Sequence, residues 1–415
     1  MKIVIIASYY PPYELGGGGI YVERIAKDLE KAGNKVTIIT TNIFNNLDSF
    51  KLLRKNEKNI AIYRFYPFNV YANINAYKKH IILKIIWHLI DLWNIHSYFT
   101  IKKILKKEKP DVVHTHNLGG LSAGATFRAI KNLNLPLVHT CHDHAILCPY
   151  AVLLCPFWKG ESCKYPKFPC EIYRKIKRKI IHDPDIVTAP SQFVLNNHTV
   201  AGFFKGSKKI VIPLGIELDK FNNLSDNGKA AENFNILYVG GLSKIKGVHI
   251  LIEVFKKIFQ VNVKLHIVGG GDYASTLKGL AKNDNRIIFY GKLPNQEVQR
   301  FYKESDVVVV PSICYENSPT VIYESFRAGT PVISSNIGGI PELIKDNHNG
   351  FLFEAGNIIR LREILENIIE NPEQLKDLSK NAFEAVKQYD MNKHIGQLIK
   401  IYKEAIELNN LKDDK

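Results

Sequence analysis

Short apolar runs alternate along the chain with segments in which apolar side chains recur every three to four positions. An apolar run bounded by turn residues is typical of a buried parallel strand, and the three-to-four spacing is typical of a helix packed on one face. We therefore expect an α/β protein. The expected strands are residues 2–7, 35–40, 60–65, 111–115, 136–141, 184–189, 209–212, 235–239, 264–268, 287–290, 306–310 and 330–335. The expected helices are residues 20–32, 192–200, 248–259, 320–328 and 391–408, with two more inside 76–107.

The chain is longer than one domain usually packs, and the pattern restarts at residue 235. A length of 415 residues predicts two domains. Residues 222–232 are polar and show neither periodicity, which is typical of a linker. The pattern in each half therefore predicts a doubly wound parallel sheet. Such a sheet binds ligands at the carboxyl ends of its strands.

The segment 311–342 contains a strand end, a loop and a helix in an order that makes an anion site. Ser318 is the expected N-cap and Pro319 the first helical residue, so free N–H groups of the helix face the loop. Glu316 in the loop and Glu324 in the helix bracket this site. Because Glu324 lies roughly 7.5 Å beyond Pro319 along the axis, the two acids are expected to reach different parts of one elongated ligand.

The spacing of these acids resembles the E-x7-E motif of the retaining glycosyltransferases of family 4, which have the GT-B fold. The flanks resemble that family too, and they are Pro311-Ser312, Ala328-Gly329-Thr330-Pro331-Val332, Gly338-Gly339-Ile340-Pro341-Glu342 and Asn349-Gly350-Phe351. The resemblance implies two Rossmann-like domains facing across a cleft, with the acceptor bound by residues 1–215 and the donor by residues 216–388. A helix in 389–415 would cross back to the first domain. Leu214 and Glu217 depart from the family's Asn-Gly-Ile-Asp sequence at the exit from the first domain.

The resemblance also implies which residues bind the nucleotide of a nucleotide-sugar donor. Gly291 and Leu293 resemble the backbone that pairs with the base, and Glu324 is placed to accept the ribose hydroxyls. In the first domain, residues 16–19 are glycines in a long loop, and Gly17 matches the residue that closes on the donor phosphate. The spacing in this loop is not G-x-G-x-x-G, and no acid follows the next strand, so we do not expect a nicotinamide site.

The diphosphate is expected to bind Lys246 and the N–H groups of Thr320 and Val321. The family more often has Gly-Arg-Leu after the first strand of this domain; here Gly241 occupies the arginine position. Lys244 either replaces that cation or points into solvent. Because lysine and helix dipole supply the positive charge and no D-x-D follows a strand, neither a metal nor another cofactor is expected.

The transferred sugar is expected to contact Glu316 and the amides of Asn317 and Ser318. The predicted strands 111–115 and 136–141 both end in histidines, at the sheet edge where ligands bind. A histidine at a strand end is more often structural than functional. However, the second of these segments resembles the family's His-Asp segment, which implies that His142 is close to the sugar, with His116 on the acceptor side.

Four cysteines follow in a loop-rich insertion at about residues 145–175. Cys148, Cys155, Cys163 and Cys170 are spaced seven, eight and seven residues apart, with no C-x-x-C pair. A structural zinc site, disulfides and free thiols are all compatible with this spacing.

The net charge of +16 suits nucleic acid, an anionic membrane or phosphorylated ligands. Much of the excess lies in residues 76–110 and 171–181, where lysines and arginines are interleaved with apolar side chains. These segments are either surfaces that rest on anionic headgroups or solvated helix faces. No signal peptide and no stretch of about 20 uncharged residues is present, so we expect a cytoplasmic protein, at the inner face of the plasma membrane if the first interpretation holds.

The resemblance implies a retaining glycosyltransferase of the hexosyltransferase type. It would move a sugar from a UDP- or GDP-sugar to a glycan, lipid-linked or other acceptor in polysaccharide, glycolipid or glycoprotein glycan synthesis. The alternatives are a nucleotide-sugar epimerase of the same fold and a basic nucleic-acid-binding protein without enzymatic activity. The aromatic residues are not arranged as stacking platforms for bases, so nucleic acid is not the expected partner.

Overall fold

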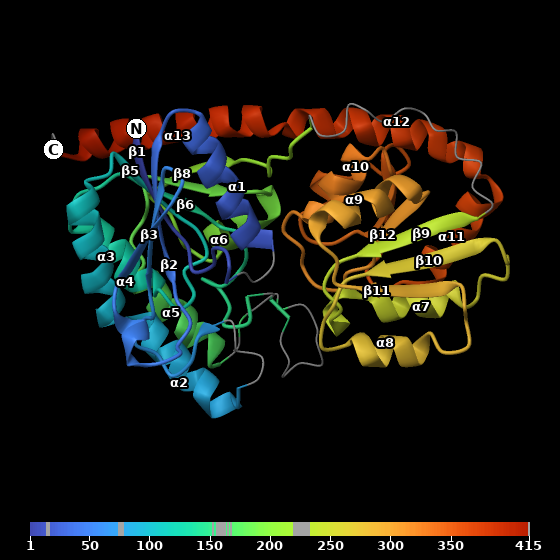
Figure 1. Cartoon of the computed structure of the whole chain (residues 1–415), viewed down its shortest axis with the longest axis horizontal. Helices are drawn as coiled ribbons and strands as arrows, with labels where there is room; N and C mark the ends of the chain where they lie inside the picture. The colour runs from blue at the N-terminus through green and yellow to red at the C-terminus, as the bar shows by residue number, and fades with distance from the viewer. Residues whose placement is uncertain are drawn as a thin grey trace. The chain divides into compact units, whose positions relative to one another are not determined.

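The computed structural model describes residues 1–13, 17–73, 79–151, 153–154, 163, 166, 168–218 and 233–413. The chain forms two compact units (Figure 1). One consists of Met1–Pro213 with Ile395–Lys415, and the other of Leu214–His394. The predicted linker 222–232 lies outside the described residues.

The first unit contains an eight-stranded sheet in the order β3-β4-β2-β1-β5-β6-β7-β8. Its neighbouring strands are parallel, except that β3 is antiparallel to β4. Every residue of β5, β6 and β7 is buried, as expected for apolar strands covered on both faces. The strands are β1 (Lys2–Ile6), β2 (Lys35–Thr41), β3 (Leu53–Glu57), β4 (Ile60–Phe65), β5 (Val112–Thr115), β6 (Leu137–Thr140), β7 (Ile186–Ala189) and β8 (Lys208–Val211).

Three helices of this unit begin at an asparagine or serine cap. Asn94, Ser122 and Ser191 each accept a hydrogen bond from a backbone N–H of the first turn of α3, α4 and α6. The helices are α1 (Gly17–Lys31), α2 (Ile81–Leu92), α3 (Ile95–Glu108), α4 (Ala123–Lys131), α5 (Cys170–Ile180) and α6 (Gln192–Val200), with the short η1 (Leu47–Phe50). The final helix α13 (Met391–Asp413) belongs to this unit from Ile395 onward.

The edge strand β3 has no counterpart among the predicted strands. All five of its residues are exposed, so it carries no apolar pattern that a sequence could reveal. It forms because a two-residue turn at Lys58-Asn59 folds it back on β4, with Leu53 opposite Arg64 and Glu57 opposite Ile60. Lys58 has φ 53°, the left-handed backbone that such tight hairpin turns require.

The second unit contains a six-stranded sheet in the order β11-β10-β9-β12-β13-β14. All neighbouring strands in it are parallel. The order reverses between β9 and β12, and such a switch point is where a doubly wound sheet binds ligands. The strands are β9 (Phe234–Val239), β10 (Val263–Val268), β11 (Ile287–Gly291), β12 (Val307–Val310), β13 (Val332–Ser335) and β14 (Gly350–Phe353).

Helices cover both faces of this second sheet, and an apolar core lies under each layer. Figure 1 shows α9 and α10 on one side of the sheet and α7 and α8 on the other. One core contains Leu251, Phe255 and Leu277, and the other contains Tyr302, Ile322 and Phe326. The helices are α7 (Val248–Phe255), α8 (Ala274–Leu280), α9 (Asn295–Glu304), α10 (Thr320–Arg327), α11 (Ile358–Glu370) and α12 (Leu375–Val386), with the short η5 (Lys244–Lys246), η6 (Ile340–Glu342), η7 (Pro372–Gln374) and η8 (Lys387–Tyr389).

In the part of the chain that the structure describes, no helix combines the length and the apolar character needed to cross a bilayer.

Candidate functional site

Two predicted site residues of the second unit, Lys246 and Glu316, contact each other directly. The Lys246 Nζ lies 2.6 Å from the Glu316 Oε1. The hydroxyl of Ser312 donates to the same oxygen at 2.7 Å. Lys246 ends η5 after β9, and the other two lie in the loop between β12 and α10, so this cluster sits at the switch point of the sheet.

Two glycine turns hold this cluster because only they allow the backbones to approach so closely. Gly247 has φ 72°, and a Cβ there would lie 1.8 Å from the carbonyl oxygen of Pro311. Gly338 has φ 67°, and a Cβ there would lie 2.1 Å from the carbonyl oxygen of Glu316. The N–H of Gly339 donates to that oxygen at 2.8 Å. The Lys-Gly and Gly-Gly motifs therefore fix the backbone on both sides of Glu316.

Lys246 remains charged in this setting. Burial alone would lower its pKa, but the carboxylate of Glu316 and the neighbouring Cys314 raise it by more, so the net shift is upward. The Glu316 side chain is 14% exposed and the Lys246 side chain 33% exposed. The pair is thus a partly buried cation and carboxylate, each still within reach of a ligand.

Glu324 lies on α10 and has a partner that the sequence analysis did not identify. The hydroxyl of Tyr302, on α9, donates to the Glu324 Oε2 at 3.0 Å. Burial raises the pKa of Tyr302, and the charge of Glu324 adds to this effect, so the phenol stays protonated as the donor. Tyr302 belongs to an ordinary amphipathic helix pattern, and only the packing of α9 against α10 reveals its role.

The start of α10 differs from the prediction in its capping. Ser318 was expected to be the N-cap, but α10 begins at Thr320 and its N-cap position is Pro319, in extended conformation. The Ser318 hydroxyl instead contacts the hydroxyl of Tyr323 at 2.6 Å. Pro319 has no side-chain group to cap the helix, so the first-turn N–H groups of Thr320 and Val321 have no N-cap side chain to which they can donate.

Gly291 and Leu293, expected near the base, lie at the end of β11 and just after it. Gly241 and Lys244, the positions considered for a second cation at the diphosphate, follow β9. Gly291 ends β11 with φ 73°, and its carbonyl accepts from the N–H of Gly269 at 2.8 Å. Leu293 is partly buried against the core on the α9–α10 side. Gly241 has open space around it, because a Cβ there would meet no neighbouring atom within 4 Å. Lys244 is exposed on η5.

In the first unit, the structure brings the two predicted histidines into contact. His116 follows β5 and His142 follows β6, and the His116 Nδ1 lies 2.8 Å from the His142 Nε2. Tyr21 of α1 presents its ring edge-on to both imidazoles. Burial, together with the neighbouring imidazoles of His114, His142 and His139, holds the pKa of His116 well below its ordinary value. A neutral His116 therefore fixes the orientation of His142.

The two loops that carry these histidines are each held by a buried charged side chain from another helix. Asp91 of α2 accepts hydrogen bonds from the N–H groups of Gly120 at 2.7 Å and Ser122 at 3.1 Å, in the loop after β5. Lys177 of α5 donates to the carbonyl of Ala145 at 3.1 Å, in the loop after β6. Burial lowers the pKa of Lys177, but nearby phenol and carboxyl groups raise it by more, so the amine stays charged. Both loops thus depend on helices outside the site.

The glycine loop differs from the prediction, because α1 begins at Gly17 rather than at residue 20. The first turn of α1 packs closely: a Cβ at Gly18 would lie 3.2 Å from the Asn117 Oδ1, and one at Gly19 would lie 3.3 Å from the Tyr9 Cβ. Gly17 itself is exposed at the start of the helix. The preceding residues 14–16 lie outside the described part of the chain.

Cys148, Cys163 and Cys170 line one small cavity together with Arg174. Cys155 lies outside the described residues. Among the residues that are described, no group of three or more histidines, cysteines or acids is arranged to hold a metal ion. The choice between zinc, disulfides and thiols therefore stays a prediction.

Two solved structures share this fold over nearly the whole chain. Sucrose-phosphate synthase from Thermosynechococcus elongatus superposes with a TM-score of 0.76 and 21% identity, over 97% of this chain and 98% of that one. Alr3699/HepE of Anabaena, solved in complex with UDP, superposes with a TM-score of 0.70 and 19% identity, over 97% of this chain and 100% of that one. The fold is therefore GT-B, as predicted.

Two family models match consecutive parts of the chain. "Glycosyltransferase Family 4" matches residues 15–220, and "Glycosyl transferases group 1" matches residues 219–385. The chain belongs to this glycosyltransferase family, which confirms the predicted family. It is similar to an uncharacterized 42.6 kDa protein in the cps region of Klebsiella pneumoniae, with 27% identity over 97% of this chain and all of that protein. It is also similar to the putative teichuronic acid biosynthesis glycosyltransferase TuaC of Bacillus subtilis, with 24% identity over 95% and 96% of the two chains.

Proposed function

We propose that the protein is a retaining hexosyltransferase that moves a sugar from a UDP- or GDP-sugar to a glycan or lipid-linked acceptor. The observation that carries this proposal is the cluster of Lys246, Glu316 and Ser312 beside the start of α10, at the switch point of the second sheet. A cation, a carboxylate and free helix N–H groups in one place suit a ligand with a phosphate next to hydroxyl groups.

The diphosphate would bind Lys246 and the N–H groups of Thr320 and Val321. A lysine amine has three donors, and the contact with Glu316 uses one of them. The remaining donors can reach phosphate oxygens while the contact with Glu316 persists. The pair would then mark the junction between phosphate and sugar, where negative charge develops on the leaving group.

The nucleoside end would bind further along the same edge. Glu324 would accept the ribose hydroxyls, held in place by the hydroxyl of Tyr302. Gly291 and Leu293 would contact the base through their backbone. On the other unit, Gly17 at the start of α1 would close on the donor phosphate.

The transferred sugar would contact Glu316 and the amides of Asn317 and Ser318. His142 would lie near the sugar, oriented by His116 on the acceptor side. In same-face transfer, the bond from the anomeric carbon to the leaving phosphate breaks as the bond to the acceptor oxygen forms. The acceptor proton passes to the leaving phosphate oxygen, so no protein nucleophile is needed. Glu316 would stabilise the positive charge that builds up on the sugar.

The acceptor pathway is proposed from the relatives and from the basic segments. The names of the two relatives mention a cps region and teichuronic acid biosynthesis, and the second of these supports a role in cell-envelope polysaccharide synthesis. Such acceptors are often lipid-linked, so we place the reaction at the inner face of the plasma membrane, with the protein bound peripherally.

A screen of UDP- and GDP-sugars for donor hydrolysis and transfer tests this function. We expect one donor to be consumed, with retained anomeric configuration in the product by NMR. Glu316→Gln should abolish turnover, while Glu304→Gln on α9, whose side chain is 62% exposed, should leave it unchanged. Inverted product would refute retention, conversion of the donor into its epimer would establish the epimerase alternative, and no binding of any nucleotide sugar would refute the proposal.

A further inference from the structure

The basic and apolar region 76–110 divides into two helices of opposite character. In α3, Ile101, Ile104 and Leu105 are buried against the core, and the exposed apolar side chains Ile95 and Phe99 lie only in its first two turns. In α2, only Trp87 and Asp91 are buried. Its exposed apolar side chains, between 38% and 61% exposed, are Ile81, Ile82, Leu83, Ile85, Ile86 and Leu89.

Helix α5 lies beside α2 and extends this apolar surface. The rings of His88 on α2 and Tyr173 on α5 meet edge-on, with centroids 5.9 Å apart. On its outer side α5 exposes Ile172 and Ile176, which are 49% and 39% exposed, and the preceding Phe168 is 81% exposed. We call the exposed side chains of these two adjoining helices the α2–α5 face.

Cations accompany the apolar side chains on this face. Lys175 and Lys179 are exposed on α5, one and two turns along from Ile172 on the same side of the helix, and Glu171 is the single acid of α5. Apolar side chains flanked by cations match the boundary of a bilayer, where acyl chains meet negatively charged headgroups. A protein partner for so basic a surface would need matching acids, and the chain's own charge of +16 argues against a second copy.

We propose that the α2–α5 face docks on an anionic lipid bilayer. The 12 residues of α2 span about 18 Å, well short of the roughly 30 Å of a hydrocarbon core, so the helix lies in the membrane plane rather than across it. This inference rests on the surface alone and holds whether or not the assignments in the donor site are correct. The proposal also separates the two interpretations of the basic segments. It assigns the membrane surface to α2 and α5, and it leaves the lysines of α3 as a solvated helix face.

Co-sedimentation of the whole chain with lipid vesicles tests the proposal. The probes are vesicles of phosphatidylcholine alone and vesicles in which roughly one lipid in three is phosphatidylglycerol. We expect binding to the mixed vesicles, weakening as salt is raised, and little binding to phosphatidylcholine. Equal binding to both vesicles, or none to either, overturns the proposal.

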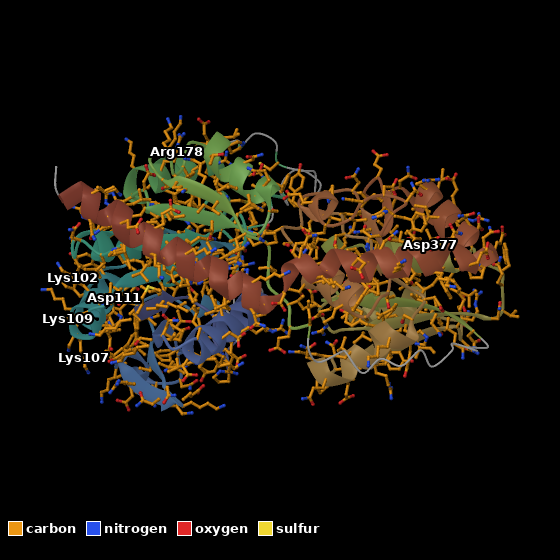
Figure 2. All side chains as sticks on the ribbon, turned by 90° about the horizontal axis from the view of Figure 1, so that it is seen from above. Lys102, Lys107, Lys109, Asp111, Arg178 and Asp377 are labelled. Atoms are coloured by element: carbon orange, nitrogen blue, oxygen red, sulfur yellow. The ribbon has the colours of Figure 1, made fainter. Side chains whose placement is uncertain are left out.

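Two sets of variants assign the binding to this face. Ile82→Gln/Ile85→Gln/Leu89→Gln replaces exposed side chains with good helix formers and should lower partitioning at least about tenfold. Lys175→Glu/Lys179→Glu should lower it about tenfold or more, and should flatten the salt dependence. The matched charge control is Lys106→Glu/Lys107→Glu on α3, because Figure 2 shows Lys107 with Lys102 and Lys109, well apart from Arg178 of α5. The matched apolar control is Ile359→Gln on α11, which is 73% exposed.

Thermal unfolding and donor binding distinguish a loss of vesicle binding from a loss of folding or of the donor site. Each variant should keep the wild-type unfolding temperature and donor affinity, since every altered side chain is exposed and none belongs to the donor site. Loss of vesicle binding in the controls as in the face variants would show a general effect of charge or hydrophobicity and would refute the assignment to α2 and α5. If the wild-type chain self-associates and the α2 variant abolishes that instead, the face is a protein interface and the bilayer proposal is wrong.

Discussion

Replacing Lys246 by alanine tests how much of the transfer depends on one side-chain cation. The change removes an amine that contacts Glu316 at 2.6 Å and leaves that carboxylate oriented by Ser312. A charge-assisted hydrogen bond contributes about 1.5–3 kcal/mol, which corresponds to a factor of about 10 to 150 in rate. Because Lys246 is one-third exposed, solvent screens part of the loss, and we expect the lower end of that range. Transfer should therefore slow at least about tenfold.

Single-turnover transfer at saturating donor is the assay, because it isolates the chemical step from donor binding. Lys244→Ala is the matched control, since that lysine is exposed on the same turn and should matter much less. Lys246→Arg should recover only part of the rate, because a planar fork does not occupy the place of a point charge. Adding Glu316→Gln to Lys246→Ala should restore part of the donor affinity, because it removes a carboxylate left uncompensated near the diphosphate. Near-normal rates in Lys246→Ala would remove this residue from the mechanism and direct attention to Lys244.

Three further predictions concern the roles of Glu324 and Glu316, the support that Tyr302 gives to Glu324, and stability at low pH. Glu324→Ala should chiefly weaken nucleotide binding in calorimetry, whereas Glu316→Ala should chiefly lower turnover; equal losses of affinity would contradict these roles. Tyr302→Phe should weaken nucleotide binding by about two- to tenfold through lost orientation of Glu324, and unchanged affinity would show that the hydroxyl is not needed. Stability to urea should fall as the pH drops from about 6.5 towards 4, because burial holds several histidines neutral in the folded state while the unfolded chain takes up protons. Asp91, whose pKa burial raises to about 6, and Asp143, whose pKa burial also raises, oppose this trend, and a midpoint unchanged between pH 7 and pH 5 would refute it. The histidine pKa values are about 4 for His88 and His198 and about 3 for His139 and His144.

Apart from β14, the buried strands were predicted, because an apolar run such as Val307–Val310 has no other stable environment than the middle of a covered sheet. It missed β3 because an exposed edge strand is defined by its turn and its partner, which leave no apolar pattern. It placed Ser318 as a cap because local capping rules do not include Tyr323, one turn further on, which competes for the hydroxyl.

The candidate site was predicted as a set of residues but not as a set of contacts. The motif identified Lys246 and Glu316 separately, one for phosphate and one for sugar, and their ion pair depends on two turns about 70 residues apart that meet across glycines. Tyr302 and the contact between His116 and His142 likewise depend on how neighbouring elements pack. The opposite character of α2 and α3 could not be predicted from composition, since both contain apolar residues at helical spacing and only burial separates them.

Helices α2 and α5 each have a buried charged side chain on one side and exposed side chains on the other. Asp91 and Lys177 are buried and hold the histidine loops, while Ile82, Ile85, Ile172 and Lys175 of the same helices are exposed. The exposed residues can therefore be changed without removing the contacts that hold the loops. The inner residues have no such freedom, because losing either one strands a polar backbone group in the core. Two selection pressures thus act on opposite sides of one pair of helices, and swapping outer residues between related enzymes should transfer membrane preference without transferring substrate choice.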